Sequence, residues 1–291
     1  VGGYLVAYLL AVEVARSHHL YAANLIGSAL GALALLGALP FLGGEGVVWL
    51  AIGMGALGAG MLTYAQSQGV LTARCSIVVV NALALLGAIS GLAWRPAWWA
   101  VRLSPYKALS YALQAPSTRL ERSGWHTSGR VDVVSGEQIH SAPGLSLRYE
   151  GSLPLQAGLT FDGDDLVPIS RRMAPEDRAF LRYLPLSVAA SLRPGGSALI
   201  LSPRGGMDVS LLLEYGFGRV AVVEENPLVF TVIRDLYSEF TGGLYRDPRV
   251  ELIRNDGRSA LQRDRRTYDL VVFSLAESYH PLTAGTYGLR E

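Results

Sequence analysis

The first third of the chain is a succession of long apolar stretches. Tyr21–Leu42, Gly46–Ala65 and Cys75–Trp94 contain no charged residue, and only short connections separate them. Each is long enough for the helix of about 20 residues that crosses a bilayer core. Val1–Val14 resembles the end of another such helix. The pattern predicts about four transmembrane helices in residues 1–94, the first of them truncated, rather than a soluble bundle of buried helices.

A different pattern follows an aromatic segment. Residues 95–103, next to Trp94, contain Trp, Arg and Pro and predict an interfacial linker where the chain leaves the bilayer. Residues 104–170 then alternate β-type positions with turn signals such as Asp162-Gly163, which predicts a small, mostly antiparallel β-rich subdomain. Its candidate strands are Arg130–Val134, Leu145–Tyr149, Leu159–Phe161 and Leu166–Ile169.

Residues 171–291 alternate short apolar runs with helical patterns. Such alternation predicts a parallel, doubly wound sheet. We therefore expect an α-helical transmembrane region followed by an α/β Rossmann-like domain of the class I methyltransferase type, with a small N-terminal β unit. The chain begins with Val inside an apolar stretch and stops soon after the fourth run, so we expect the Rossmann-like domain to be C-terminally incomplete. The expected strands are Ala198–Leu201, Val220–Val223, Val250–Ile253 and Leu270–Phe273, and the expected helices are Pro175–Ala190, Asp208–Tyr215 and Leu228–Phe240.

Charge is concentrated in the second part of the chain. Only two of 25 Lys and Arg residues and two of 24 Asp and Glu residues precede residue 95. No charge lies within a full apolar segment, which favours membrane anchoring over transport. A net charge of +1 without a basic stripe gives nucleic-acid binding little support. We expect no metal site, because His18 and His19 lack further ligands, and a single cysteine excludes an internal disulfide.

Polar residues follow the ends of the predicted strands, where doubly wound sheets bind ligands. Gly205-Gly206 offers backbone N–H groups after the first strand. Glu224 ends the second strand, where an acid can accept hydrogen bonds from ribose hydroxyls. Asp256 follows the third, in reach of an adenine amine. Taken alone, these features are a tight turn, an acid near a helix start and a turn former; their joint order predicts an adenosine-type ligand.

Several segments carry a family resemblance. They are Leu199–Pro227 (LILSPRGGMDVSLLLEYGFGRVAVVEENP), Gly242–Ser259 (GGLYRDPRVELIRNDGRS), Ser104–Lys107 (SPYK), Gly129–Asp132 (GRVD) and, in the apolar part, Leu20–Gly31 (LYAANLIGSALG). Together they resemble the spermidine synthase family of aminopropyltransferases, specifically its bacterial membrane-fused spermidine synthase-like members. The resemblance covers nearly the whole chain.

The resemblance implies a transferase of polyamine biosynthesis. It would move an aminopropyl group from decarboxylated S-adenosylmethionine to an amine such as putrescine, with no metal. By position, Glu224 would hold the ribose and Asp256 would contact the adenine, while the glycine turn would shape the cofactor loop. The cofactor-binding residues implied in this way are Gly205, Gly206, Asp208, Glu224, Asp256 and Gly257.

The sequence departs from the family at two places. Ser202, Pro203 and Arg204 replace three glycines of the cofactor loop. Ser274 stands where the family has an Asp that helps to deprotonate the attacking amine. A serine with no adjacent base is a poor proton acceptor at neutral pH, so Glu277, one turn further on, becomes the second catalytic candidate.

Other readings stay open. Tyr183 and Tyr279 are candidates for amine binding, with ordinary packing as the simpler explanation. A methyltransferase using S-adenosylmethionine is an alternative, because Arg204 can pair with the carboxylate that the decarboxylated donor lacks. A non-catalytic nucleotide-binding or sensing module, fused to a membrane domain, is a third, and Ser274 with the altered loop favours it.

Partners and location follow from the same features. We expect a lipid bilayer and a small polyamine or other amine as partners, and the sequence leaves a homo-oligomer open. Adenosyl sulfonium donors are made in the cytosol. We therefore expect an integral membrane protein, in a bacterial inner membrane, with its soluble domain on the cytoplasmic side.

Overall fold

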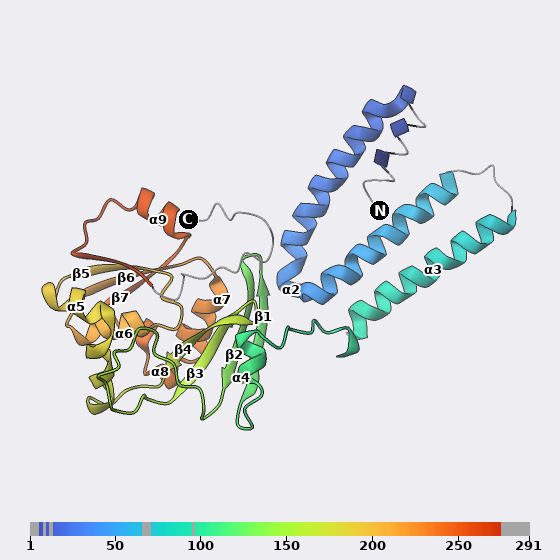
Figure 1. Ribbon diagram of the computed structural model, residues 1–291. Coiled ribbons are helices and arrows are strands. Elements are labelled where there is room, and N and C mark those ends of the chain that lie inside the picture. Colours follow the sequence, from blue (N-terminus) through green and yellow to red (C-terminus); the bar gives the residue numbers. More distant parts are fainter. Residues whose placement is uncertain (1–5, 8–9, 12–13, 66–70, 95–96, 275–291) are drawn as a thin grey trace. The chain divides into compact units, whose positions relative to one another are not determined.

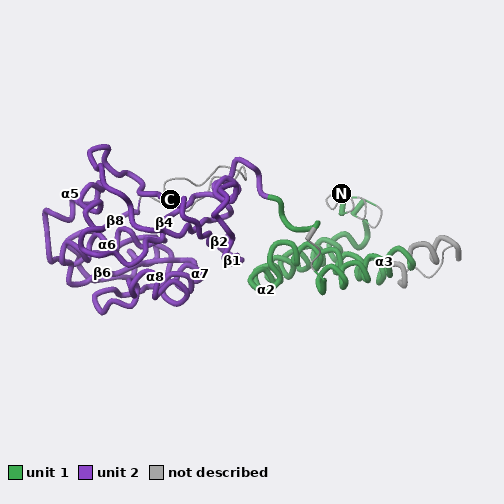
Figure 2. Tube along the Cα trace, turned by 90° about the horizontal axis from the view of Figure 1, so that it is seen from below, with its two compact units in different colours: residues 1–102 green, residues 103–291 purple. Residues whose placement is uncertain are grey.

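The chain divides into two compact units, residues 1–102 and 103–291 (Figure 2). The division falls within the predicted linker, residues 95–103. The structure is a computed structural model, and it describes residues 6–7, 10–11, 14–65, 71–94 and 97–274.

Long apolar helices form the first unit (Figure 1). Helix α2, Ser17–Ala65, is two helical arms that meet at Gly43, whose φ of 71° and ψ of 177° are not helical. Such a conformation is open to glycine because it has no Cβ. Helix α3, Leu71–Trp94, packs along the second arm. Short 3-10 turns, η1 (Val14–Arg16) and η2 (Ala97–Trp99), flank these helices.

Close contacts join the second arm of α2 to α3 and to the end of the unit. A Cβ on Gly91 would lie 2.3 Å from ring carbons of Trp49, so glycine is what lets the indole reach α3. The Trp49 ring in turn lies 4.8 Å from that of Trp99. Glu45 Oε1 accepts a hydrogen bond of 3.0 Å from the backbone N–H of Val101. These contacts hold the last residues of the unit against the junction of the two arms.

The described helices of this unit are apolar on all sides. By length and composition alone, one of them, Val14–Met61, is able to cross a membrane, and Val78–Trp94 is a shorter apolar helix. Large apolar side chains remain exposed along both, among them Leu33, Val80 and Leu83. The helix expected over Val1–Val14 falls largely outside the described residues.

The second unit begins with an antiparallel sheet in the order β1-β2-β3-β4. One of its faces packs on the main core of the unit through Val133 and Leu159, and the other packs on Leu109 of helix α4. The bounds are α4 Ala108–Ala112, β1 Arg119–His126, β2 Gly129–Ser135, β3 Gln156–Phe161 and β4 Asp164–Ser170.

One strand prediction in this region was wrong, and one strand was missed. Leu145–Tyr149 forms turns rather than a strand: Tyr149 N donates to Ser146 O at 3.0 Å, and Leu147 is fully exposed. Strand β1 was missed because its sequence, RLERSGWH, lacks apolar alternation. It forms as an edge strand through its backbone pairing with β2. Backbone pairing of an exposed edge strand leaves little trace in a hydrophobic pattern.

The remaining strands form a wholly parallel sheet in the order β7-β6-β5-β8. Helix α6, Met207–Glu214, covers one face through Val209 and Leu212. Helix α9, Gly257–Arg263, covers the other through Ala260. The expected parallel, doubly wound sheet is thus confirmed. Its strands are β5 Ser197–Leu201, β6 Arg219–Glu224, β7 Val250–Arg254 and β8 Leu270–Phe273.

Two expected helices are each broken into shorter pieces. Pro175–Ala190 separates into the 3-10 helix η3 and α5 at Leu184, whose backbone is extended. Pro185 follows, and proline disfavours helical backbone in the residue before it. Leu228–Phe240 is likewise divided, with a π-helical turn in its middle. The bounds are η3 Glu176–Tyr183, α5 Pro185–Leu192, α7 Pro227–Phe230, η4 Thr231–Leu236, α8 Ser238–Thr241 and η5 Leu244–Arg246.

Candidate functional site

The four parallel strands end in one row. Leu201 of β5 lies beside Val223 of β6 and Phe273 of β8, and Glu224 lies beside Arg254 of β7. Backbone hydrogen bonds continue past the strand ends, including Ser202 N to Val223 O at 2.8 Å. The segments that leave these strands therefore begin at the same edge of the sheet, which is where doubly wound folds bind ligands.

The loop from Ser202 to Gly206 has several left-handed residues, as a glycine-rich turn would, although its first three residues are Ser202, Pro203 and Arg204. Ser202 (φ 52°) and Arg204 (φ 46°) are left-handed, as is Gly206 (φ 84°). A Cβ on Gly205 would lie 2.1 Å from the carbonyl oxygen of Pro168 in β4. Gly205 is explained by its close packing against β4, and Gly206 by its left-handed φ. Neither glycine requires a bound ligand to explain it.

The left-handed backbone at Ser202 yields a stability prediction. L-residues other than glycine lose roughly 1 kcal/mol or more in this conformation. Replacing Ser202 by glycine is expected to raise the free energy of unfolding by about 0.5–1 kcal/mol, after the greater freedom of glycine in the unfolded chain is subtracted. Urea unfolding of the complete chain in detergent measures it.

Ser210→Gly is the matched control for this prediction, because Ser210 lies inside helix α6. Glycine there is expected to lower the free energy of unfolding by about 0.5 kcal/mol. If both variants lose stability equally, the backbone at Ser202 is not strained.

Arg204 points from this loop toward the small sheet. Its guanidinium forms an ion pair with Asp165 and lies 4.2 Å from the ring centre of Phe161. The side chain is buried, and the backbone carbonyl of Arg204 accepts a hydrogen bond of 3.3 Å from Tyr245 Oη. The side chain therefore ties the loop to the β3–β4 hairpin, and the backbone carbonyl ties it to η5.

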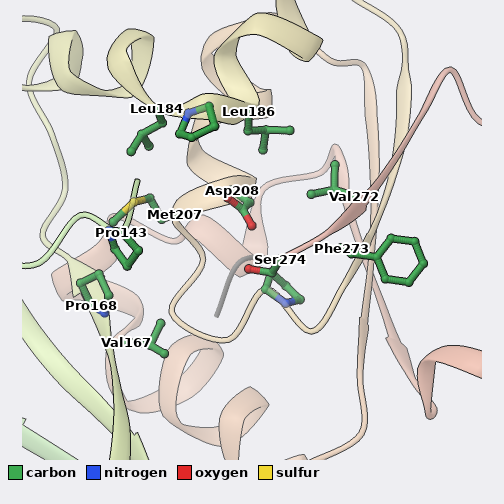
Figure 3. Close-up of a pocket in the computed structure, with 12 residues that line it drawn as sticks. Pro143, Val167, Pro168, Leu184, Leu186, Met207, Asp208, Val272, Phe273 and Ser274 are labelled. Atoms are coloured by element: carbon green, nitrogen blue, oxygen red, sulfur yellow. The ribbon is translucent and has the colours of Figure 1, made fainter. Parts of the chain in front are cut away.

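Asp208, in the first turn of α6, meets Ser274 at the end of β8. The Ser274 hydroxyl lies beside the Asp208 carboxylate (Figure 3); Ser274 is buried and Asp208 is half-buried. Burial raises the pKa of Asp208, an effect that the Ser274 hydroxyl partly opposes. Ser274 therefore has an acidic neighbour in space, supplied by a different element of the fold, and that neighbour is a stronger proton acceptor than an exposed aspartate.

A pocket of about 230 Å³ opens at this pair (Figure 3). Asp208 and Ser274 are the two polar members of its lining, and apolar side chains surround them. The lining comes from the β2–β3 connection, β4, the start of α5 with the residue before it, the loop after β5, α6, and β8 with the residue after it. Its residues are Pro143, Val167, Pro168, Leu184, Pro185, Leu186, Pro203, Met207, Asp208, Val272, Phe273 and Ser274.

Glu224 lies buried at the end of β6. Its Oε1 accepts a hydrogen bond of 3.0 Å from Asn226 N, which fixes the carboxylate at the start of α7. Burial, together with the negative charges of Glu224 and Asp208, raises the pKa of Tyr245 well above its usual value. Tyr245 therefore stays neutral between the two acids. Tyr245 was not among the predicted site residues, although it lies within the segment GGLYRDPR that carries part of the family resemblance.

Asp256 is the N-cap of helix α9. Its Oδ1 accepts a hydrogen bond of 2.9 Å from Ser259 N. Hydrogen bonds from the backbone and side chain of Ser259 lower the pKa of Asp256, which keeps it ionised. The next residue, Gly257, has room for a Cβ in ordinary contact with Leu201. Asp256 therefore stabilises the turn into α9, as its simpler explanation predicted. Packing would allow a larger residue in place of Gly257.

Among the remaining candidate residues, Tyr183 lies in the part of the chain that the structure describes. It is partly exposed at the end of η3, and its ring centre lies 5.2 Å from that of Tyr149. Tyr183 is not part of the pocket lining, although the next three residues are. Glu277 and Tyr279 lie outside the described residues. Within the described part of the chain, no group of three or more His, Cys, Asp or Glu side chains is arranged to hold a metal ion.

Comparison with known proteins gives one sequence relative and a set of solved structures. The chain is 30% identical over 89 residues to the polyamine aminopropyltransferase of Korarchaeum cryptofilum (strain OPF8), a match that covers 31% of this chain and 28% of the relative. No family model matches the chain.

The solved structures include two spermidine synthases. The enzyme from Thermotoga maritima aligns with a TM-score of 0.38 and 17% identity, over 55% of this chain and 48% of that chain. A spermidine synthase in complex with the transition-state analogue AdoDATO aligns with a TM-score of 0.37 and 17% identity, over 54% and 48%. The chain thus spans less than half the length of each of these proteins.

Proposed function

We propose that this chain is part of a membrane-anchored, spermidine synthase-like transferase that moves an aminopropyl group from decarboxylated S-adenosylmethionine to an amine. Its sequence similarity to a polyamine aminopropyltransferase supports the reaction class. The observation that carries the proposal is that Asp208 and Ser274 are the two polar side chains of an otherwise apolar pocket at the ends of β5 and β8.

The pair answers the chemical requirement that Ser274 by itself does not meet. In aminopropyl transfer the amine nitrogen attacks the carbon beside the sulfonium. The C–N bond forms as the C–S bond breaks, the electron pair stays on sulfur, and methylthioadenosine leaves. The amine must also lose a proton, and Asp208, with its raised pKa, is the acceptor that we assign. Ser274 then orients the carboxylate, while Glu277 remains a candidate outside the described residues.

The donor would lie along the edge of the sheet from this pair. Glu224 would hold the ribose hydroxyls and Asp256 the adenine amine, because their carboxylates follow the next two strands in the sheet order. Gly205 and Gly206 would act indirectly, by fixing the loop against β4. Tyr183 and Tyr279 stay proposed contacts of the amine.

Calorimetric titration of the complete protein in detergent tests the proposal. We expect tighter binding of decarboxylated S-adenosylmethionine and of methylthioadenosine than of S-adenosylmethionine. Preference for S-adenosylmethionine would favour methyl transfer instead. Binding without any turnover would favour the non-catalytic sensing module, and absence of all three interactions would overturn the nucleotide site.

The position of Arg204 no longer favours a methyltransferase. It relied on Arg204 as the partner of the donor carboxylate, but the Arg204 guanidinium is paired with Asp165 and stacked on Phe161. To reach a ligand it would have to leave Asp165 without that partner. We therefore expect Arg204→Gly to lower stability and to leave the affinity for S-adenosylmethionine unchanged.

Two substitutions of Asp256 distinguish its role as a helix cap from its proposed contact with adenine. Asp256→Ala is expected to lower the free energy of unfolding by about 1 kcal/mol, because it removes the N-cap. Asp256→Asn keeps a cap oxygen and is expected to retain stability, yet to bind methylthioadenosine at least tenfold more weakly, since its remaining group is a donor facing an amine. Urea unfolding and calorimetry give the two values. Equal affinity in the Asn variant would remove Asp256 from the adenine site.

The apolar helices support the membrane part of the proposal. Exposed apolar side chains lie along α2 and α3, and a helix that is apolar on all sides is stable in lipid rather than in water. We propose an inner-membrane location with residues 103–291 in the cytoplasm, where the donor is made. Extraction from membranes by detergent but not by alkaline carbonate is expected. A reporter fused after Lys107 that is active only outside the cell would overturn the orientation.

A further inference from the structure

Tyr245, in η5, is a buried phenol that the proposed reaction does not use. Only 3% of its surface is exposed, and its hydroxyl donates a hydrogen bond of 3.3 Å to the backbone carbonyl of Arg204. Its ring packs against the same loop, because a Cβ on Gly206 would lie 3.3 Å from Tyr245 Cε1 and 3.6 Å from its Oη. A residue 41 positions away in sequence therefore holds the backbone of the loop that leads to Asp208.

The hydrogen bond to Arg204 fixes one peptide of this loop. The peptide between Arg204 and Gly205 is trans, so its C=O and N–H point to opposite sides, and a bonded carbonyl also sets the direction of the Gly205 N–H. Gly205, without a Cβ, would accept other orientations of this peptide. The left-handed φ of 46° at Arg204 is itself unfavourable for an L-residue. The observed orientation therefore depends on contacts from outside the loop, and Tyr245 supplies the contact to the backbone.

The surroundings of Tyr245 keep its hydroxyl in the donating form. Burial and the negative charges of Glu224 and Asp208 raise the pKa of Tyr245 well above its usual value. The phenol therefore stays protonated at neutral pH, and it is the protonated phenol that can donate to a carbonyl. The two acids that we assign to the donor and to the amine thus also preserve the bond that holds the loop.

We propose that Tyr245 is a positioning residue of the donor site: its hydroxyl holds the Arg204–Gly205 peptide in the orientation in which the loop receives the adenosyl sulfonium donor. The inference rests on the proposed function for the identity of this ligand. It assigns the role to the backbone carbonyl of Arg204 and not to the Arg204 side chain, which is paired with Asp165.

Replacing Tyr245 by phenylalanine in the complete protein tests this role. The variant keeps the ring and loses the hydroxyl. It is expected to bind methylthioadenosine about three- to tenfold more weakly in calorimetry, the usual effect of one lost hydrogen bond. In turnover assays the KM for the donor is expected to rise by a similar factor, while the KM for the amine stays unchanged.

Two matched variants locate the effect. Tyr268→Phe removes a hydrogen bond of 2.7 Å from Tyr268 Oη to Asp264, ahead of β8 and so at the opposite end of the sheet. Arg204→Gly removes the side chain and retains the carbonyl that Tyr245 reaches. Both are expected to bind methylthioadenosine as tightly as the unaltered protein does.

Hydrogen exchange separates release of the loop from general loss of stability. In Tyr245→Phe the amides of residues 202–206 are expected to exchange faster, with the other strands of the parallel sheet unchanged. Faster exchange throughout residues 197–274 would make Tyr245 a purely structural residue and overturn the inference.

The binding outcomes distinguish the inference from the proposed function. Equal affinity of Tyr245→Phe and the unaltered protein for methylthioadenosine overturns the positioning role and leaves the nucleotide site standing. Absence of nucleoside binding by the unaltered protein overturns the proposed function, and the inference with it.

Discussion

Replacing Arg130 by alanine is expected to lower the free energy of unfolding by about 3–5 kcal/mol, because it leaves a buried carboxylate without its ion-pair partner. The Asp132 side chain is fully buried, and Arg130 Nη2 lies 2.8 Å from its Oδ1. The other oxygen, Oδ2, has no hydrogen-bond partner among the described residues, nor does Thr160 Oγ1 on the facing strand. The carboxylate therefore depends on Arg130.

Urea unfolding of the complete chain in detergent measures this loss. The matched control is Arg119→Ala, since Arg119 on the neighbouring strand pairs with Glu121 at 2.6 Å while its own side chain is 79% exposed. Exposed pairs contribute at most about 1 kcal/mol. Similar losses in the two variants would mean that the Asp132 carboxylate is reached by solvent. The double variant Arg130→Met with Asp132→Leu is expected to recover most of the stability.

Replacing Asp208 by asparagine is expected to lower turnover by about two to four orders of magnitude, the usual contribution of a positioned general base. Asparagine preserves the size of the side chain and can still accept a hydrogen bond from Ser274, but it cannot take a proton from the amine. The measurement is aminopropyl transfer by the complete protein at saturating donor. Unchanged turnover would remove Asp208 from the proposed mechanism and return the role to Glu277.

The same variant is expected to gain stability at neutral pH, which separates loss of chemistry from loss of fold. The pKa of Asp208 is raised by burial. An acid whose folded-state pKa is raised stabilises the fold below its unfolded pKa, and this contribution is lost as pH rises through the folded-state pKa. Asp208→Asn should therefore be the more stable protein at pH 7, with the gain vanishing as pH falls below about 4. Asp177→Asn, at an exposed site, should show neither effect.

Local pattern predicted the regular elements of the parallel sheet well. Strand β8 has the predicted bounds, and β5, β6 and β7 differ from prediction by one or two residues. Buried parallel strands are continuous apolar runs, which makes them visible without any tertiary information. Strand β1 was invisible for the opposite reason, because an exposed edge strand is held by backbone hydrogen bonds to β2 rather than by apolar burial.

Some residues of the candidate site were likewise predictable from local sequence, and others were not. Glu224, Asp256 and the turn at Gly205-Gly206 were proposed as site residues from their order after successive strands, and the structure brings the ends of those strands into one row. The pairing of Asp208 with Ser274 had no signal in the sequence. Asp208 was expected to shape the cofactor loop, and Ser274 was expected to lack an adjacent base.

The sequence by itself determined the apolar first part, the parallel doubly wound sheet and the acids at its strand ends, because each depends on short-range periodicity and on residues close in the chain. Only the tertiary structure decided that Arg204 pairs with Asp165, that Gly205 is fixed by β4 and that Asp208 reaches Ser274. Each of these contacts joins elements distant in sequence, and packing, not local preference, sets which side chains meet there.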